Sequence, residues 1–297
     1  MIISVASGKG GTGKTTIAVN LALVIAGEKD KNVHFLDCDV EEPNAHLFLK
    51  PNITNRELVT IPIPEIDDSK CTYCGKCAQV CAFNALAVTK NKVLVFPELC
   101  HGCGACSLLC PEKAINEVGK EIGVVEEGKA DSIKFLDGRL NIGETIAPPI
   151  IKRIKKKALT EYNLEVKESS GLNSQHIVLI DAPPGTSCPV IEAVKDSDYT
   201  ILVTEPTPFG FHDLVLAVEV LEKLQIPYGV VLNKCDIGDR QVEEYCQKNS
   251  IPILLSIPLD REIAVAYSKG IPIVNMNQAY REKFLKLFQN VLKIMQN

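Results

Sequence analysis

The sequence predicts an α/β fold in which a mostly parallel sheet is flanked by helices and carries a small, cysteine-rich α+β insertion. Three observations support this prediction. Short apolar runs alternate with helical patterns along most of the 297-residue chain, as parallel βαβ units require. A glycine-rich turn joins the first apolar run to the first helical stretch. Eight of the twelve cysteines fall between Cys71 and Cys110, where the alternation stops.

The composition limits the classes of protein. A hydrophobic content of 46% supports a substantial core, and a net charge of −5 gives no basic field for nucleic acid. No apolar run reaches the ~20 residues that cross a bilayer. The chain begins directly with an apolar strand pattern, and clustered cysteines without a secretion signal indicate metal ligation in a reducing compartment. We therefore expect a cytoplasmic protein without a nucleic-acid partner.

The first element is a buried strand near residues 2–5, followed by a helix from Lys14. The turn between them fits G-x-x-x-x-G-K-[ST], the phosphate-binding loop. Glycines let backbone N–H groups approach a polyphosphate, Lys14 supplies a cation, and the Thr15 hydroxyl completes a Mg²⁺ shell. The same glycines fit the dinucleotide motif G-x-G-x-x-G, but that motif does not require the Lys-Thr pair. The expected nucleotide contacts are Gly8, Gly10, Gly11, Thr12, Gly13, Lys14, Thr15 and Thr16.

Two later strands are predicted to end in aspartates. Residues 33–37 lead to Asp37 and Asp39, at the sheet edge where α/β proteins bind ligands; a helix N-cap is the alternative for either residue. Residues 175–180 end at Asp181, the Walker B arrangement near Mg²⁺. Gly185 follows and is expected to offer its N–H group to the γ-phosphate.

Pro62 and Pro64 indicate an edge strand followed by a linker. Beyond them, the spacing C-x2-C-x2-C-x3-C occurs twice and resembles bacterial two-cluster ferredoxins, in which the fourth cysteine of each run ligates the other cluster. Two zinc sites are the alternative, although these usually use separated C-x2-C pairs. The resemblance implies one 4Fe–4S cluster on Cys71, Cys74, Cys77 and Cys110, and a second on Cys100, Cys103, Cys106 and Cys81.

These patterns predict a discontinuous nucleotide domain, residues 1–65 and 119–297, interrupted by a ferredoxin domain at residues 66–118. Inside the insertion we expect a hairpin over residues 85–96 and a helix after Cys110. Extended strands over residues 122–144 and a helix over residues 147–159 then lead back into the main sheet.

The segments KGGTGKTT, DCDVEEPN, RLNIGE and DAPPGTSCP, together with the cysteine insertion, resemble MinD/ParA/Mrp-superfamily P-loop ATPases. The resemblance implies that Lys9 reaches a partner's nucleotide across a dimer, and that Asp39 orients the attacking water. It implies Mg²⁺ held by Thr15, Asp39 and Asp181, with Lys9, Lys14 and Asp39 as the catalytic residues.

Two further residues are interpreted through this resemblance. Asn233 is expected to recognise adenine, although N-K-x-D at residues 233–236 is also the guanine signature of GTPases. The Lys9 loop and residues 257–273 favour ATP. Cys188 lies at a spacing similar to that of a cluster ligand in the nitrogenase iron protein, but no second cysteine stands at a matching position, so a structural role is expected.

The predicted function is a dimerising ATPase that couples nucleotide state to electron transfer through two 4Fe–4S clusters. The alternative is an iron–sulfur or metal-cofactor carrier ATPase. Expected partners are a second copy or a paralogous ATPase, and a redox or Fe–S acceptor protein. A MinD-like spatial regulator would use the apolar face of residues 279–295 on a membrane, but packing against the sheet explains that face as well, so membrane binding is not expected.

Overall fold

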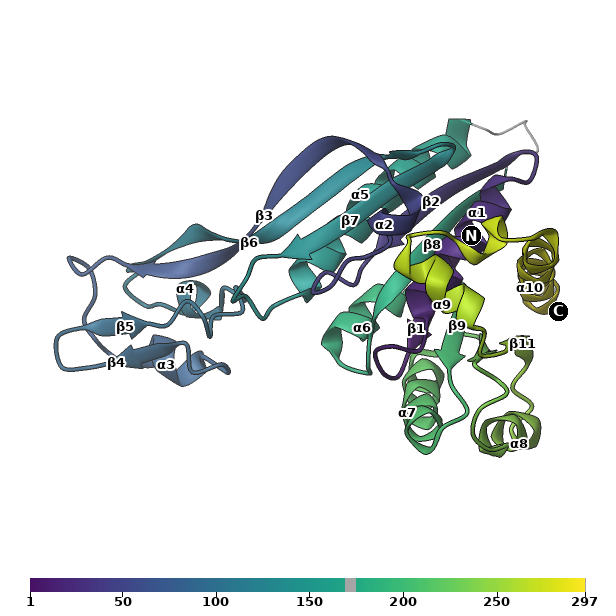
Figure 1. Ribbon diagram of the computed structural model, residues 1–297. Coiled ribbons are helices and arrows are strands. Elements are labelled where there is room, and N and C mark those ends of the chain that lie inside the picture. Colours follow the sequence, from purple (N-terminus) through teal and green to yellow (C-terminus); the bar gives the residue numbers. More distant parts are fainter. Residues whose placement is uncertain (169–174, 297) are drawn as a thin grey trace.

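The structure is a computed structural model that describes residues 1–168 and 175–296. A nine-stranded sheet runs in the order β11-β10-β9-β1-β8-β2-β7-β6-β3 and is flanked by helices (Figure 1). The strands from β11 to β7 are parallel, whereas β6 and β3 join antiparallel at one edge. The mostly parallel α/β architecture predicted from the sequence is therefore confirmed. The strands are β1 (Ile2–Ser7), β2 (Lys31–Asp37), β3 (Asn52–Ile66), β6 (Ile115–Ala130), β7 (Ile133–Leu140), β8 (Gln175–Pro184), β9 (Tyr199–Thr204), β10 (Tyr228–Asn233) and β11 (Ile253–Ile257).

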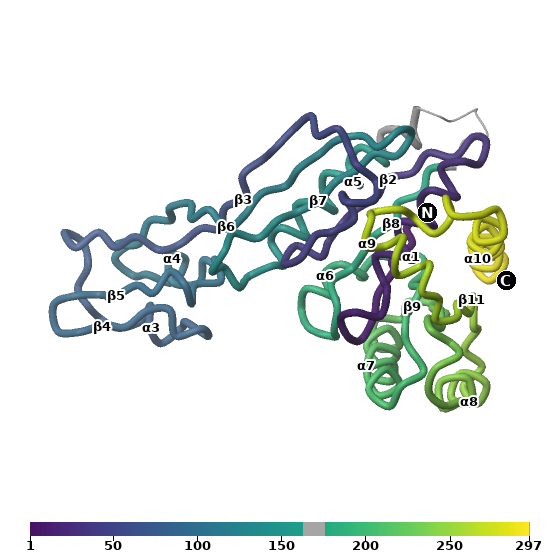
Figure 2. Tube along the Cα trace, viewed as in Figure 1, coloured from purple at the N-terminus to yellow at the C-terminus, as the bar shows by residue number. Residues whose placement is uncertain are grey.

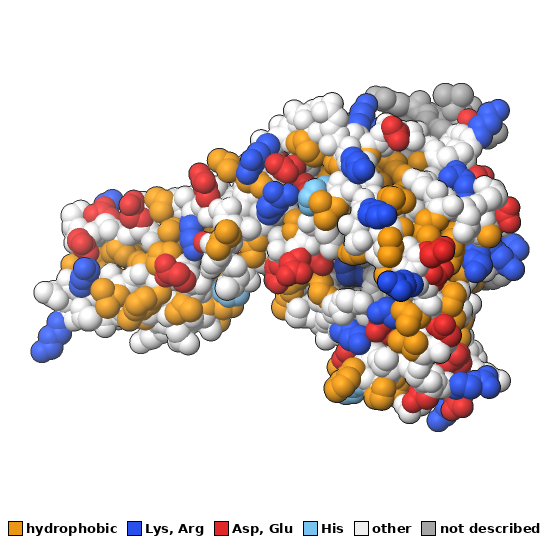
Figure 3. All heavy atoms as spheres, in the orientation of Figure 1, with side chains coloured by type: hydrophobic (Ala, Val, Ile, Leu, Met, Phe, Trp, Pro, Cys, Tyr) orange, Lys and Arg blue, Asp and Glu red, His pale blue; other side chains and the backbone are white. Residues whose placement is uncertain are grey.

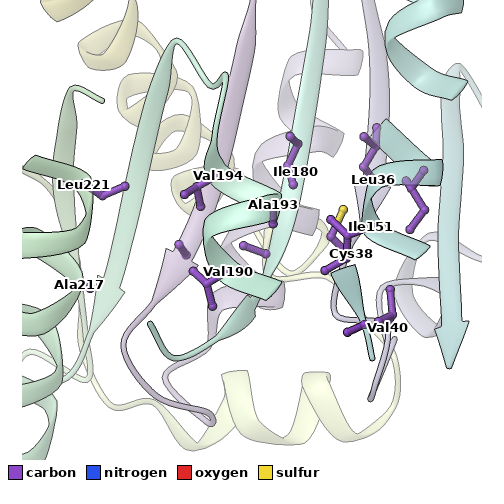
Figure 4. Close-up of a cluster of buried hydrophobic side chains, with 14 of the residues drawn as sticks. Leu36, Cys38, Val40, Ile151, Ile180, Val190, Ala193, Val194, Ala217 and Leu221 are labelled. Atoms are coloured by element: carbon purple, nitrogen blue, oxygen red, sulfur yellow. The ribbon is translucent and has the colours of Figure 1, made fainter. Parts of the chain in front are cut away.

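The helices pack in two layers, one on each face of the sheet. Figure 4 shows part of one layer, in which Leu36 and Ile180 of the sheet face Ile151, Val190 and their neighbours. The other layer is built around α1 and α10. The helices are α1 (Lys14–Ala26), α2 (His46–Leu49), α5 (Pro148–Glu168), α6 (Cys188–Val194), α7 (Pro208–Leu224), α8 (Gln241–Lys248), α9 (Arg261–Ser268) and α10 (Gln278–Gln296), with a 3-10 turn η1 at Ile273–Asn275.

The last helix uses its apolar face inside the protein. Phe284, Leu287, Phe288 and Val291 are buried against the core, which is the packing alternative named for residues 279–295. None of the helices in the described ranges combines the length and the apolarity needed to cross a bilayer. Basic and acidic side chains are interspersed over the face that Figure 3 shows.

The edge strand β3 is longer than the sequence predicted. It pairs with β6 from Asn52 opposite Lys129 to Ile66 opposite Ile115, so no linker follows Pro64. The prolines lie on the outermost strand, where a missing N–H group costs no ladder bond. The two strands form a ribbon that carries residues 67–114 away from the sheet and from both termini (Figures 1 and 2).

Residues 67–114 form a small unit at the end of this ribbon. It contains α3 (Lys76–Val80), α4 (Ala105–Leu108) and an antiparallel pair, β4 (Leu86–Val88) with β5 (Val93–Val95), so the predicted hairpin is confirmed. The predicted helix after Cys110 is wrong. Lys113 has a positive φ of 50°, which ends a turn, and Ile115 then starts β6 because Ile66 offers a pairing partner. The predicted domain boundaries at 65 and 119 fall inside the ribbon.

Candidate nucleotide cleft and cysteine sites

A cleft of about 420 Å³ lies where β1, β2 and β10 end. The loop from Ser7 to Thr16 forms one side of it. The other side comes from residues 257–267, at and beyond the end of β11. Of the predicted site residues, the cleft is lined by Lys9, Gly10, Gly11, Gly13, Lys14, Thr15, Thr16, Asp39 and Asn233, whereas Gly8, Thr12, Asp181 and Gly185 do not line it.

Glycine is required at two places in the loop by the fold itself. A Cβ on Gly8 would stand 2.1 Å from the Asp213 carbonyl oxygen. Gly13 has a φ of 90°, and a Cβ there would stand 2.5 Å from Asn233 Nδ2. Left-handed backbone is strained for any residue with a side chain. The conformation of the loop therefore excludes a side chain at both positions.

Lys14 lies between two aspartates, Asp39 and Asp181. Its ammonium lies 3.0 Å from Asp181 Oδ1 and 3.5 Å from Asp39 Oδ2, and its side chain is buried. Burial lowers the pKa of Lys14, but the two carboxylates outweigh burial, and the pKa is raised. Burial, reinforced by Asp181, raises the pKa of Asp39 despite the attraction of Lys14.

The residues around Lys14 fit a divalent cation. The second oxygen of Asp181, Oδ2, is buried and has no hydrogen-bond partner in the described structure. A buried carboxylate oxygen without a donor is an unsatisfied acceptor, and carboxylate and hydroxyl oxygens are the ligands that Mg²⁺ prefers. Asp181, Asp39 and Thr15 are therefore a suitable donor set.

Asp37 and Asp39 have different surroundings. The Asp37 carboxylate is fully buried and accepts hydrogen bonds from the backbone N–H groups of Asp39, Asn44 and Ala45, at 3.2, 3.1 and 3.0 Å. Burial and the nearby Asp181 raise the pKa of Asp37 well above its usual value. Asp37 thus fastens the loop before α2 but does not cap that helix, whose N-cap is Ala45. Of the two aspartates, only Asp39 lines the cleft.

Asn233 fastens the phosphate-binding loop to β10. Its Nδ2 donates to the Thr12 carbonyl at 2.8 Å, and its Oδ1 accepts from the Lys234 N–H group.

Asp236, which would contact a guanine base in N-K-x-D proteins, accepts from the Leu259 N–H group and does not line the cleft. Gly185 donates its N–H group to the Ser7 carbonyl at 2.9 Å.

Sequence reasoning missed a buried glutamate beside the loop. Glu205, which follows β9, lies 3.8 Å from the Lys9 ammonium and 2.5 Å from that of Lys234. It also missed the wall formed by Pro258, Leu259 and Tyr267, although residues 257–273 had been singled out as typical of ATP-binding relatives. No short motif marks Glu205, because its role depends on two loops that are distant in the sequence.

The eight clustered cysteines surround two separate cavities at the end of the ribbon. The structure brings together the two crossed sets that the ferredoxin resemblance implied. Backbone N–H groups point at equivalent sulfurs in both sites, from Ala85 to Cys81 and from Ala114 to Cys110, each at 3.3 Å. One cavity is lined by Cys71, Cys74, Cys77 and Cys110, and the other by Cys81, Cys100, Cys103 and Cys106.

The donor chemistry of these cavities fits iron–sulfur clusters, because four soft thiolates surround each space and N–H groups reach the sulfurs. No three His, Cys, Asp or Glu side chains in the described ranges are grouped so as to hold a single metal ion. The two cavities lie at different positions along the β3–β6 ribbon. The Cys100 cavity contacts Pro62, Pro64 and Glu117, and the Cys71 cavity contacts Ile66 and Ile115, farther from the sheet.

The cysteines outside the insertion divide into buried and accessible ones. Cys38 and Cys246 are fully buried in the core. Cys188 is exposed at the first residue of α6, and its structural role stays a prediction. The residues that α6 buries are Val190, Ala193 and Val194.

Comparison with known proteins identifies the family. Residues 3–273 match the CobQ/CobB/MinD/ParA nucleotide binding domain. The uncharacterized protein MJ0579 of Methanocaldococcus jannaschii is 34% identical, with 93% of each chain covered. An iron–sulfur cluster carrier protein of Pyrococcus horikoshii is 26% identical over 92% of this chain and 78% of its own.

Solved structures show the same fold. The septum site-determining protein MinD of Pyrococcus horikoshii, solved with Mg-ADP, superposes with a TM-score of 0.56 at 23% identity and covers 99% of this chain and 96% of its own. The family match spans the loop, both acidic strand ends and the cleft wall described above. This chain belongs to the CobQ/CobB/MinD/ParA family of nucleotide-binding proteins.

Proposed function

We propose that this protein is a Mg-ATP-dependent, dimerising ATPase that holds two 4Fe–4S clusters in residues 67–114 and delivers iron–sulfur clusters to acceptor proteins. One observation carries the proposal: two four-cysteine cavities stand at the end of a ribbon continuous with the sheet that bears the phosphate-binding loop. Relatives named iron–sulfur cluster carrier proteins support the carrier role.

The nucleotide part of the proposal follows from the charges around Lys14. Without nucleotide, Lys14 is the counter-ion of Asp181 and Asp39. Asp181, Asp39 and the Thr15 hydroxyl would hold Mg²⁺ when Mg-ATP binds, and Lys14, released from the two carboxylates, would contact the phosphates. The ion supplies charge neutralisation for phosphoryl transfer. Asp39 positions the attacking water, and Lys9 contacts the nucleotide of the second subunit.

ATP is the proposed nucleotide. Asp236 is already bonded to the Leu259 N–H group and stands outside the cleft lining, so the acceptor that would select guanine is engaged elsewhere. Nucleotide-dependent thermal shifts provide the test. We expect Mg-ATP to raise the melting temperature more than Mg-GTP at equal concentration, and a larger shift with GTP would contradict the assignment.

The carrier role is tested by following iron and sulfide. Anaerobically reconstituted protein is mixed with an apo-ferredoxin, with or without Mg-ATP, and the acceptor is separated and its iron counted. We expect about eight iron atoms per chain before transfer, as two 4Fe–4S clusters require, and ATP-dependent loss to the acceptor. The Lys14→Ala variant is the matched control and should keep its iron without responding to ATP.

Electron transfer is the second candidate, because each of the two cavities is lined by four cysteines, as in two-cluster ferredoxins. It predicts that dithionite-reduced protein reduces an acceptor at a rate that depends on nucleotide while its own iron content stays constant. Transfer of iron without reduction of the acceptor favours the carrier, and the reverse result favours electron transfer.

A further inference from the structure

Glu205 is a nearly buried carboxylate that holds two lysines from different loops. It follows β9, the strand between β1 and β10, so it lies beside the loops that carry Lys9 and Lys234. Its side chain is 10% exposed. Both lysines line the nucleotide cleft and Glu205 does not. The carboxylate therefore acts on the cleft only through the cations it holds.

The two contacts are unequal. Lys234 Nζ lies 2.5 Å from Glu205 Oε1, which is a direct hydrogen-bonded pair, whereas Lys9 Nζ lies 3.8 Å from Oε2, near the limit of an ion pair. Removing the sole partner of a buried charge is strongly destabilising. Here Lys9 can leave without that penalty, because Lys234 stays as the counter-ion. The contact with Lys9 is therefore the releasable one.

We propose that Glu205 is a positioning residue that retains Lys9 within its own chain, and that Lys234 sets the strength of this hold by competing for the same carboxylate. The inference rests on the proposed function, in which Lys9 crosses to the nucleotide of a second subunit. The Lys9 ammonium must break its contact with Glu205 to do so. Glu205 thus opposes dimerisation until a partner's phosphates offer a stronger anionic site.

Two substitutions should move the dimerisation equilibrium in opposite directions. In Glu205→Gln the carboxylate charge is lost and Lys9 is released, so dimers form at lower nucleotide concentration. In Lys234→Met the carboxylate keeps Lys9 as its only cation, so dimers require more nucleotide. We expect shifts of about 3- to 10-fold each way, the size that a partly exposed ion pair supplies. General damage to the cleft would move both variants in the same direction.

The experiment is sedimentation velocity of the full chain over a titration of Mg-AMPPNP. Because Lys234 lines the cleft, the affinity of each variant for Mg-ADP is measured separately, and dimer fractions are compared at equal saturation. The double variant Glu205→Gln/Lys234→Met should behave as Glu205→Gln does. Glu222→Gln, which removes an exposed carboxylate that accepts from the Tyr228 hydroxyl, is the matched control and should match the unmodified chain.

Raising the ionic strength gives an independent measurement. The Lys9 side chain is 29% exposed, so salt screens its contact with Glu205, and the difference between Glu205→Gln and the unmodified chain should shrink. If both single variants shift alike, or neither shifts, the retaining role of Glu205 is overturned and the proposed function stands. If the unmodified chain stays monomeric at saturating Mg-AMPPNP, the dimer of the proposed function fails, and this inference fails with it.

Discussion

The nucleotide cleft and the cysteine sites are organised in opposite ways. In the cleft, the charged groups are already paired within the chain, as Lys14 is with Asp181 and Lys234 with Glu205, and a large two-layer core lies behind them. In residues 67–114, all of which the structure describes, few side chains are buried: Ala85, Leu86, Val93, Cys100 and Ala114.

The sheet with its helices and the insertion therefore obtain their stability from different sources. The sheet and its helices bury enough apolar surface to fold without a ligand. The insertion does not, and in chains below about 70 residues a metal or disulfides usually supplement the small core. We therefore infer that the cleft is preorganised for its ligand, whereas the insertion depends on the proposed clusters for its fold.

The largest expected effect is on the insertion when cysteines proposed to ligate its clusters are replaced. In a Cys71→Ser/Cys100→Ser variant, amide hydrogens of residues 67–114 should exchange about 100-fold faster or more, because metal binding in small domains is folding free energy. Exchange in β1, β8 and α1 should stay unchanged. Hydrogen exchange by mass spectrometry measures both regions at once. Cys188→Ser is the control, and a protected insertion without iron would abolish the contrast.

A substitution in the cleft should show the reverse pattern. Lys14→Ala removes the cation proposed to contact the phosphates, so ATP hydrolysis should fall by about 100-fold or more. The iron content and the exchange of residues 67–114 should not change. Phosphate release and iron assays measure the two effects. Simultaneous loss of iron would mean that the two parts are not independent.

Asp37 and Asp39 are expected to differ in what they contribute, one to stability and the other to hydrolysis. Asp37→Ala removes the acceptor of three backbone N–H groups, so the free energy of unfolding should fall by about 3 kcal/mol. Asp39→Ala should leave stability nearly unchanged and reduce hydrolysis. Urea unfolding and phosphate release distinguish the two. Equal destabilisation by both substitutions would contradict the assigned roles.

The smallest expected effect concerns Asp137 on β7, which lies between Asp37 and Glu126 in the register of the sheet. Burial, reinforced by Glu126, raises the pKa of Asp137 to about 6. An acid whose pKa is raised in the folded state destabilises that state increasingly as the pH rises from its usual pKa to the raised one. Asp137→Asn should therefore be more stable than the unmodified chain, with an advantage that grows by about 1 kcal/mol between pH 5 and pH 8. Urea unfolding at both pH values tests this, and an advantage that shrinks with pH would contradict it.

Local patterns in the sequence predicted the parts that depend on few residues. The phosphate-binding loop, the strand ending at Asp37 and the hairpin of the insertion were placed correctly, because spacing along the chain determines them. The strand through Asp181 does not end there as predicted but continues to Pro184. The ligation of clusters by the eight cysteines stays a prediction, although the structure groups their side chains in the expected sets.

The features that could not be predicted from the sequence depend on contacts between residues that are distant in the chain. The ribbon replaced the predicted linker and helix because Ile66 and Ile115 meet as partners, which no local pattern records. Asp37 and Asp39 look alike in sequence, and only the position of the N–H groups of Asn44 and Ala45 separates them. Glu205 went unnoticed for the same reason, since its lysines are 196 and 29 residues away in the sequence.

The ribbon has one more consequence. A domain joined by a flexible linker samples many orientations, so a partner protein can bind it in many of them. Here β3 pairs with β6 from Asn52 to Ile66, and this pairing fixes the orientation of the insertion relative to the sheet. The acceptor proposed above would therefore meet the insertion in the one orientation that the pairing of β3 with β6 sets.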